Sequence, residues 1–280
     1  MASARTLVAA LTRRGPHRVL RGDLAFAGLP GAVYTPESGR NLPAVAFGHD
    51  WLTGVGRYSR LLEHLASWGI VAAAPDTECG LVPSVRNLAF DLRTALDIAA
   101  GVRLGPGTIS VHPAKLGVAG HGFGGSAAVL AAAEMSAKPT AVAAIFPSVT
   151  APPAEQPAAT LPVPGVVFAA PGDAKTLRSN AIALSHAWDA ATLRVVSKAQ
   201  PGGLPEGRRL ATVFGLPGAH RKTQKAIRAL LTGYLLATLA GDKTYRVFAD
   251  PDVQLPKTDP VDDTATPVSP EQKIAALLKH

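Results

Sequence analysis

Residues 115–126 decide the fold and read KLGVAGHGFGGS. The segment starts with a short apolar run typical of a strand, passes through a tight glycine turn and leads into an Ala-rich stretch that favours a helix. Glycine accepts backbone conformations that other residues avoid, so it suits a sharp reversal between two packed elements. We therefore expect a strand, a bend and a helix here.

Similar apolar runs alternate with helical patterns along the rest of the chain. Several of the runs are apolar throughout, as strands covered on both faces require. This alternation predicts an α/β fold with a mostly parallel central sheet and helices on both faces. The expected strands cover 44–47, 70–74, 116–119, 141–146, 165–169 and 210–214, and the helical stripes run from Leu61 to Trp68, from Val85 to Leu96 and from Ile227 to Leu235.

Composition limits the possible functions. The 280 residues are 47% apolar and 17% charged, and no apolar run approaches the roughly 20 residues of a membrane span. No secretory signal is visible, so we expect a cytoplasmic protein, and Cys79 as the single cysteine allows no internal disulfide. The net charge is +8, but the basic residues form no long run and no aromatic residues lie among them, which argues against a nucleic-acid partner.

The pattern predicts one domain over residues 1–250, with a basic N-terminal extension over 1–25. From residue 251 the chain becomes rich in proline and aspartate, which predicts a flexible tether over 251–280. The tether ends in a capping box at Ser269 with Pro270 at the first helical position, followed by a short amphipathic helix. This helix could dock on its own domain or on a protein partner.

Two mechanisms use a glycine bend of this kind. Gly120, Gly122 and Gly125 match the dinucleotide-binding fingerprint, but the next strand lacks the acidic residue that would contact a ribose. The alternative is a nucleophile elbow, G-x-S-x-G, in which Gly122 replaces the serine. We keep dinucleotide binding as the weaker alternative.

Further motifs appear in a consistent order: GAVYTP at 31–36, PAVAFGHDW at 43–51, LASWGIVAAAPDT at 65–77, VPGVVFAAPGD at 163–173 and LPGAH at 216–220. With the bend, they make residues 31–250 resemble the α/β-hydrolase family, in particular its cutinase-like polyesterase and dienelactone-hydrolase-like branch. The resemblance implies that Asp173 is the orienting acid and His220 the base of a catalytic triad. Both residues follow expected strands, so both should reach the carboxyl edge of the sheet. The alternatives are a turn-forming aspartate and a helix-capping histidine.

Two positions depart from the family pattern. Gly122 offers no nucleophile, and Asp50 stands where the oxyanion loop usually has glycine. The backbone amides of Phe123 and of Trp51 or Asp50 could still donate to an oxyanion, in a pocket that also contains His121. A carboxylate at Asp50, however, would repel a developing oxyanion.

We therefore expect a catalytically impaired pseudo-hydrolase that binds an acyl or ester ligand or a protein. The alternative is ester or lactone hydrolysis in which the His220–Asp173 dyad activates water, or in which Cys79 is the nucleophile; Ser126 and Ser148 are weaker candidates. The histidines at 49, 64, 112, 121 and 186 lack metal-binding spacing, so we expect neither a metal nor a cofactor.

Overall fold

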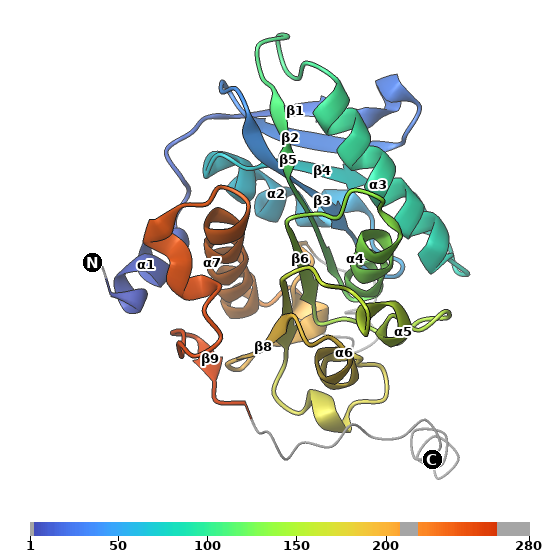
Figure 1. Ribbon diagram of the computed structural model, residues 1–280, viewed down its shortest axis with the longest axis vertical. Coiled ribbons are helices and arrows are strands. Elements are labelled where there is room, and N and C mark those ends of the chain that lie inside the picture. Colours follow the sequence, from blue (N-terminus) through green and yellow to red (C-terminus); the bar gives the residue numbers. More distant parts are fainter. Residues whose placement is uncertain (1–2, 208–217, 262–280) are drawn as a thin grey trace.

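The computed structural model describes residues 3–207 and 218–261, which form a nine-stranded sheet with helices on both faces (Figure 1). The strand order is β1-β2-β4-β3-β5-β6-β7-β8-β9; the strands from β4 to β8 are parallel, and β1, β2 and β9 pair antiparallel at the two edges. The strands are β1 Val19–Asp23, β2 Gly31–Pro36, β3 Leu42–Gly48, β4 Val71–Pro75, β5 Val111–His121, β6 Ala141–Ile145, β7 Gly165–Ala169, β8 Ala191–Val196 and β9 Thr258–Asp259. The α-helices are α1 Ala4–Leu11, α2 Ser59–Ser67, α3 Val85–Gly101, α4 Phe123–Glu134, α5 Glu155–Ala158, α6 Ala181–Ala187 and α7 Arg221–Thr238.

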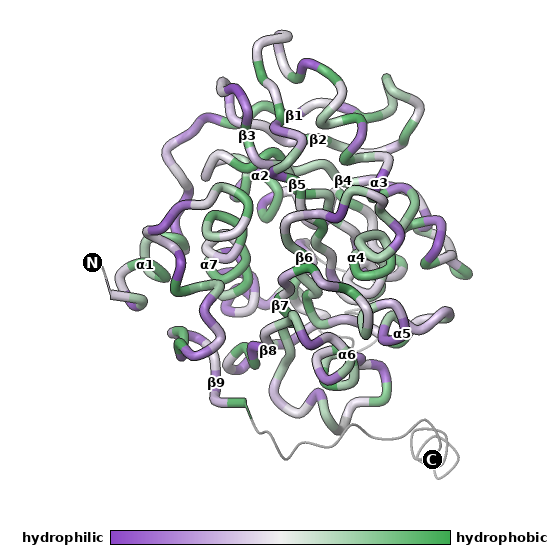
Figure 2. The backbone as a smooth tube through the Cα atoms, viewed as in Figure 1, coloured by the Kyte–Doolittle hydropathy of each residue, from purple (hydrophilic) through white to green (hydrophobic). Residues whose placement is uncertain are grey.

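Two hydrophobic layers hold the helices to the sheet. One face is covered by α1, α2 and α7, and the other by α3, α4, α5 and α6. The hydrophobic parts of the chain concentrate in the interior (Figure 2). Burial on both faces explains why the central strands are apolar throughout.

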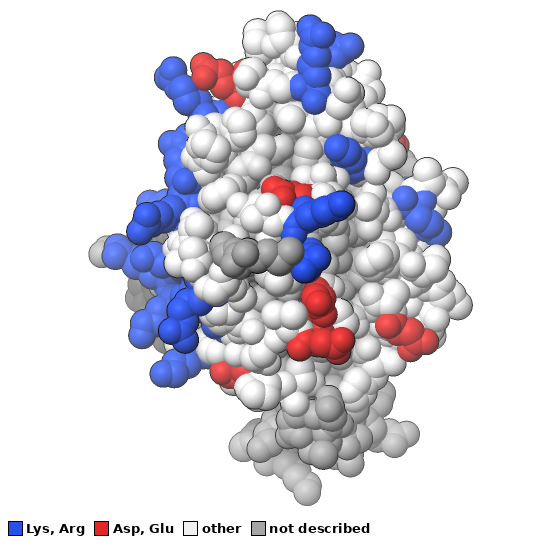
Figure 3. Space-filling view, turned by 60° about the vertical axis from the view of Figure 1, so that its left-hand side comes forward, with Lys and Arg blue, Asp and Glu red and all other residues white. Residues whose placement is uncertain are grey.

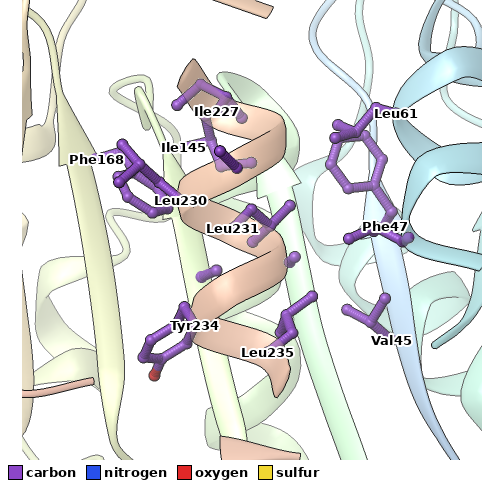
Figure 4. Close-up of a cluster of buried hydrophobic side chains, with 14 of the residues drawn as sticks. Val45, Phe47, Leu61, Ile145, Phe168, Ile227, Leu230, Leu231, Tyr234 and Leu235 are labelled. Atoms are coloured by element: carbon purple, nitrogen blue, oxygen red, sulfur yellow. The ribbon is translucent and has the colours of Figure 1, made fainter. Parts of the chain in front are cut away.

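Helix α7 shows how the sequence pattern produces this packing. Its apolar residues recur at helical spacing, and Ile227, Leu231 and Leu235 are fully buried against the sheet (Figure 4). Tyr234 lies on the same helix and donates from its hydroxyl to the carbonyl of Pro164 over 3.0 Å. The apolar stripe that was expected between Ile227 and Leu235 is therefore the face that packs on the sheet, where α7 contacts β6 and β8.

The predicted α/β class is confirmed, and the first five expected strands coincide with β3 to β7. At both ends of the expected domain the structure shows packing that the sequence did not predict. The N-terminal extension is part of the fold, because α1 packs on α7 through Leu7 and Leu11 and β1 pairs with β2. The start of the expected tether also packs, because Leu255 is buried and β9 pairs with β8. The expected strand at 210–214 and the C-terminal helix lie outside the described residues.

The surface carries its charge unevenly. Lys and Arg gather along one side of the face shown in Figure 3, while most of that face carries neither sign. Within the described ranges, no helix is long and apolar enough to cross a membrane. The absence of a nucleic-acid partner stays a prediction.

Candidate functional site

The bend between β5 and α4 is held by close backbone contacts. Gly122 adopts φ 55° and ψ −117°, a conformation that strains any residue with a side chain. Its N–H donates to the carbonyl of Ile145 over 2.9 Å, and its own carbonyl accepts from Ser148 over 3.0 Å. A side chain at Gly120 would clash with the backbone of Gly124, so these glycines let α4 lie directly against β5.

The carboxylate of Asp50 lies over this bend. Its Oδ1 accepts from the backbone N–H of Trp51 at 2.8 Å and from that of Phe123 at 3.1 Å. A Cβ atom added to Gly122 would clash with the Asp50 carboxylate and would lie 3.0 Å from its Oδ2. One carboxylate therefore fills the space of a side chain at 122 and also uses the two amides that were expected to be oxyanion donors.

Tyr58 and His121 form a buried network beside Asp50. The Tyr58 hydroxyl accepts from the backbone N–H of Asp50 at 3.1 Å and lies 2.8 Å from Nδ1 of His121. His121 is 1% exposed, and its Nδ1 lies 4.0 Å from Oδ2 of Asp50. His121, the last residue of β5, thus lies near the Asp50 carboxylate and is linked through Tyr58 to the backbone N–H of Asp50.

Asp173 and His220 do not form a dyad in the structure. Asp173 follows β7 and is buried; its Oδ2 accepts from the N–H of Ala170 at 2.8 Å, and burial raises the pKa of its carboxyl. His220 precedes α7, where its Nδ1 lies 2.7 Å from Oγ1 of Thr223. Each side chain has its own partner, and no hydrogen bond or ion pair joins the two. This local pairing is the one expected of a turn aspartate and of a histidine at a helix start.

The other nucleophile candidates are poorly placed or poorly activated. Ser126 is fully buried in α4, and its hydroxyl donates to the carbonyl of Ser148 at 2.5 Å. Cys79 is exposed, but burial of its sulfur and the nearby Asp76 carboxylate raise the pKa of its thiol to about 11. At neutral pH very little thiolate would form in such surroundings.

Spacing along the chain did not reveal one cluster. His49, Asp76 and Cys79 each place a ligand atom within 4.8 Å of the other two. The parallel pairing of β3 with β4 matches Ala44 to Val71, an offset of 27 residues that also brings position 49 beside position 76. The expectation that no histidine takes part in a metal-binding group relied on the spacing of residues along the chain. Local spacing does not reveal residues that are brought together by the pairing of β3 with β4.

Four exposed apolar side chains, here called the apolar rim, belong to the two loops that follow β3 and β4. Trp51 and Leu52 follow β3, and Leu81 and Val82 belong to the loop after β4; all four are exposed, Val82 to 94%. The two loops touch, because the Trp51 indole N–H donates to the carbonyl of Leu81 at 3.2 Å. Both loops therefore present exposed apolar side chains near the bend.

Comparison with known proteins adds no identification. No protein-family model matches this chain, and no curated protein matches it. The functional argument therefore rests on the geometry of the bend and its surroundings.

Proposed function

We propose that this chain has an α/β-hydrolase fold, has lost serine-hydrolase chemistry and binds a small apolar acyl or ester ligand. Three features support the fold: the strand order, the antiparallel β2, and the sharp β5–α4 bend at the carboxyl edge of the sheet. The motifs over 31–220 that resemble the family point the same way.

One observation carries the loss of catalysis: the Asp50 carboxylate lies over Gly122 and accepts from the amides of Trp51 and Phe123. A serine hydrolase needs a nucleophile at 122 and those amides free for the developing oxyanion. Here the nucleophile is missing and the donors hold a fixed negative charge. Loss of the nucleophile alone costs about 10⁶ in kcat in serine hydrolases.

Binding is the role that such a site retains. The apolar rim formed by Trp51, Leu52, Leu81 and Val82 offers contact area for an acyl chain beside the bend. An apolar chain gains about 0.8 kcal/mol for each methylene that it buries. A ligand held there would gain affinity with chain length rather than with charge.

Covalent labelling tests the loss of catalysis. The native chain should hydrolyse no p-nitrophenyl ester and should form no fluorophosphonate adduct. Gly122→Ser combined with Asp50→Gly should label more readily at position 122 than Gly122→Ser alone, because removal of the Asp50 carboxylate frees the amides of Trp51 and Phe123 and the space over the bend. Ser126→Ala in the double variant is the control and should leave labelling unchanged. An adduct on any serine of the native chain would contradict the proposal.

Ligand titration tests the binding role. The fluorescence of Trp51 should change on addition of fatty acids, and affinity should rise with chain length. Val82→Asp should weaken binding, whereas Phe26→Asp, at another exposed apolar position far from these loops in the sequence, should not. Equal effects of the two variants would argue against the rim as the ligand site.

A further inference from the structure

Three side chains of different chemistry meet beyond the ends of β3 and β4. The sulfur of Cys79 lies 3.7 Å from Nε2 of His49 and 3.6 Å from Oδ1 of Asp76. A tetrahedral zinc site with bonds of about 2.0–2.3 Å separates its ligand atoms by roughly 3.3–3.8 Å. Two of the three separations in this cluster already have that length, and the third lies within 4.8 Å.

The ring of His49 lies between two backbone carbonyls. The side chain is fully buried; its Nδ1 faces the carbonyl of Asp50 at 2.9 Å and its Nε2 faces the carbonyl of Thr77 at 2.6 Å. A neutral imidazole carries only one N–H, so one ring nitrogen points its lone pair at a carbonyl oxygen. When Nδ1–H donates to Asp50, the backbone hydrogen bond is of the kind that orients metal-binding histidines, and the lone pair of Nε2 can bind a metal once the Thr77 carbonyl moves away from it.

The surrounding backbone holds the three ligands in place. Asp76 Oδ1 accepts from the N–H of Val55 at 2.7 Å, which fixes the orientation of the carboxylate. The loop that carries Cys79 is fixed on α3: Glu78 accepts from Ser84 N–H at 2.6 Å, and the Thr77 hydroxyl donates to Asp91 at 2.6 Å. Asp76 and the loop that carries Cys79 are thus held in place, and the rearrangement that binding requires is a shift of the Thr77 carbonyl away from Nε2 of His49.

We propose that His49, Asp76 and Cys79 bind one divalent cation of the zinc class. The mixture of one nitrogen, one carboxylate oxygen and one sulfur suits Zn²⁺ better than Mg²⁺ or Ca²⁺, which prefer oxygen ligands. Asp76 and Cys79 are exposed, so solvent reaches the ion and fills the fourth position. Binding replaces the thiol proton of Cys79, which is released to solvent. The proposal is independent of whether the bend is a lost hydrolase site.

Metal binding to the full chain tests this proposal. After treatment with a chelator, equilibrium dialysis should show one tightly bound Zn²⁺ per chain. Co²⁺ in place of Zn²⁺ should give a sulfur-to-cobalt charge-transfer band together with the visible spectrum of a tetrahedral ion. This signature reports ligation by Cys79 in the unaltered protein, so it requires no variant to fold.

Two variants identify the ligands. Cys79→Ser should abolish the charge-transfer band, and Asp76→Asn, which keeps an oxygen for the Val55 N–H, should weaken Zn²⁺ binding by at least about 100-fold. Asp97→Asn, at an exposed aspartate on α3, is the matched control and should leave binding unchanged. Circular dichroism should show that each variant is folded. No saturable binding by the native chain, a Co²⁺ complex without the sulfur band, or equal affinity in Asp76→Asn would overturn the proposal.

Discussion

Replacing Gly122 by alanine measures how firmly Asp50 occupies the β5–α4 bend. The new methyl group would meet Cγ and both carboxylate oxygens of Asp50, in a backbone conformation with φ 55°. Two costs follow: about 1–3 kcal/mol of backbone strain, and about 1–3 kcal/mol of overpacking against the carboxylate. In an Asp50→Ala background only the strain remains. The cost of Gly122→Ala should therefore fall by about 1–3 kcal/mol when Asp50 is absent.

Urea unfolding of the four chains in this double-mutant cycle gives the coupling energy. Gly28→Ala is the matched control: Gly28 has φ 83°, and an added Cβ would meet nothing within 4 Å, so its substitution carries strain without a clash. Its cost should be the same with and without Asp50. A coupling between positions 50 and 122 below about 0.5 kcal/mol, the scatter expected of independent sites, would refute the placement of Asp50 over the bend.

Three further predictions concern titratable groups whose pKa is shifted. Burial and Asp76 raise the pKa of the Cys79 thiol to about 11. Alkylation by iodoacetamide in the presence of a chelator should therefore accelerate about tenfold per pH unit between pH 7 and 9, because only the thiolate reacts. Asp76→Asn should speed this alkylation at neutral pH. Burial raises the pKa of Asp173, so just above pH 3.8 the native state binds more protons than the unfolded state and loses stability as pH rises. Asp173→Asn should therefore raise the urea midpoint at pH 7 and have less effect near pH 3. Burial, with a contribution from Arg228, lowers the pKa of His64 from 6.5 to about 4. The free energy of unfolding should therefore fall by up to about 3 kcal/mol as pH drops from about 6.5 to about 4. His64→Leu should abolish that loss in acid denaturation curves.

Strands were predictable from sequence where both of their faces are buried. The strands from β3 to β7 are continuous apolar runs, because helices cover them on both sides. β8 was missed, because Arg194 interrupts its apolar pattern. Its guanidinium is buried and donates to the backbone carbonyls of Asp250, Pro251 and Val253, the last at 2.7 Å. A charge satisfied by residues almost sixty positions away leaves no local signal in the sequence.

The candidate site was predictable in its parts but not in its contacts. The glycine at 122 and the carboxylate at 50 stood out as departures from a recognisable pattern. The Asp50 carboxylate accepts from the amides of both Trp51 and Phe123 only in one orientation of its side chain. The sequence around Asp50 does not predict that orientation. His49 was not predicted as a metal ligand for a related reason: its partners Asp76 and Cys79 come from the neighbouring strand end, and the sequence alone does not give the register between β3 and β4.

The two proposals rest on consecutive residues yet remain separable. Side chains on extended backbone alternate in direction, and beyond β3 this sends His49 toward the end of β4 and Asp50 toward the end of β5. His49 uses the backbone carbonyl of Asp50, not its carboxylate, so Asp50→Ala should leave the cobalt spectrum intact. Cys79→Ser should likewise leave the coupling between positions 50 and 122 unchanged. If either substitution disturbed both readouts, the two sites would be one structural unit, and the end of β3 could not have two independent roles.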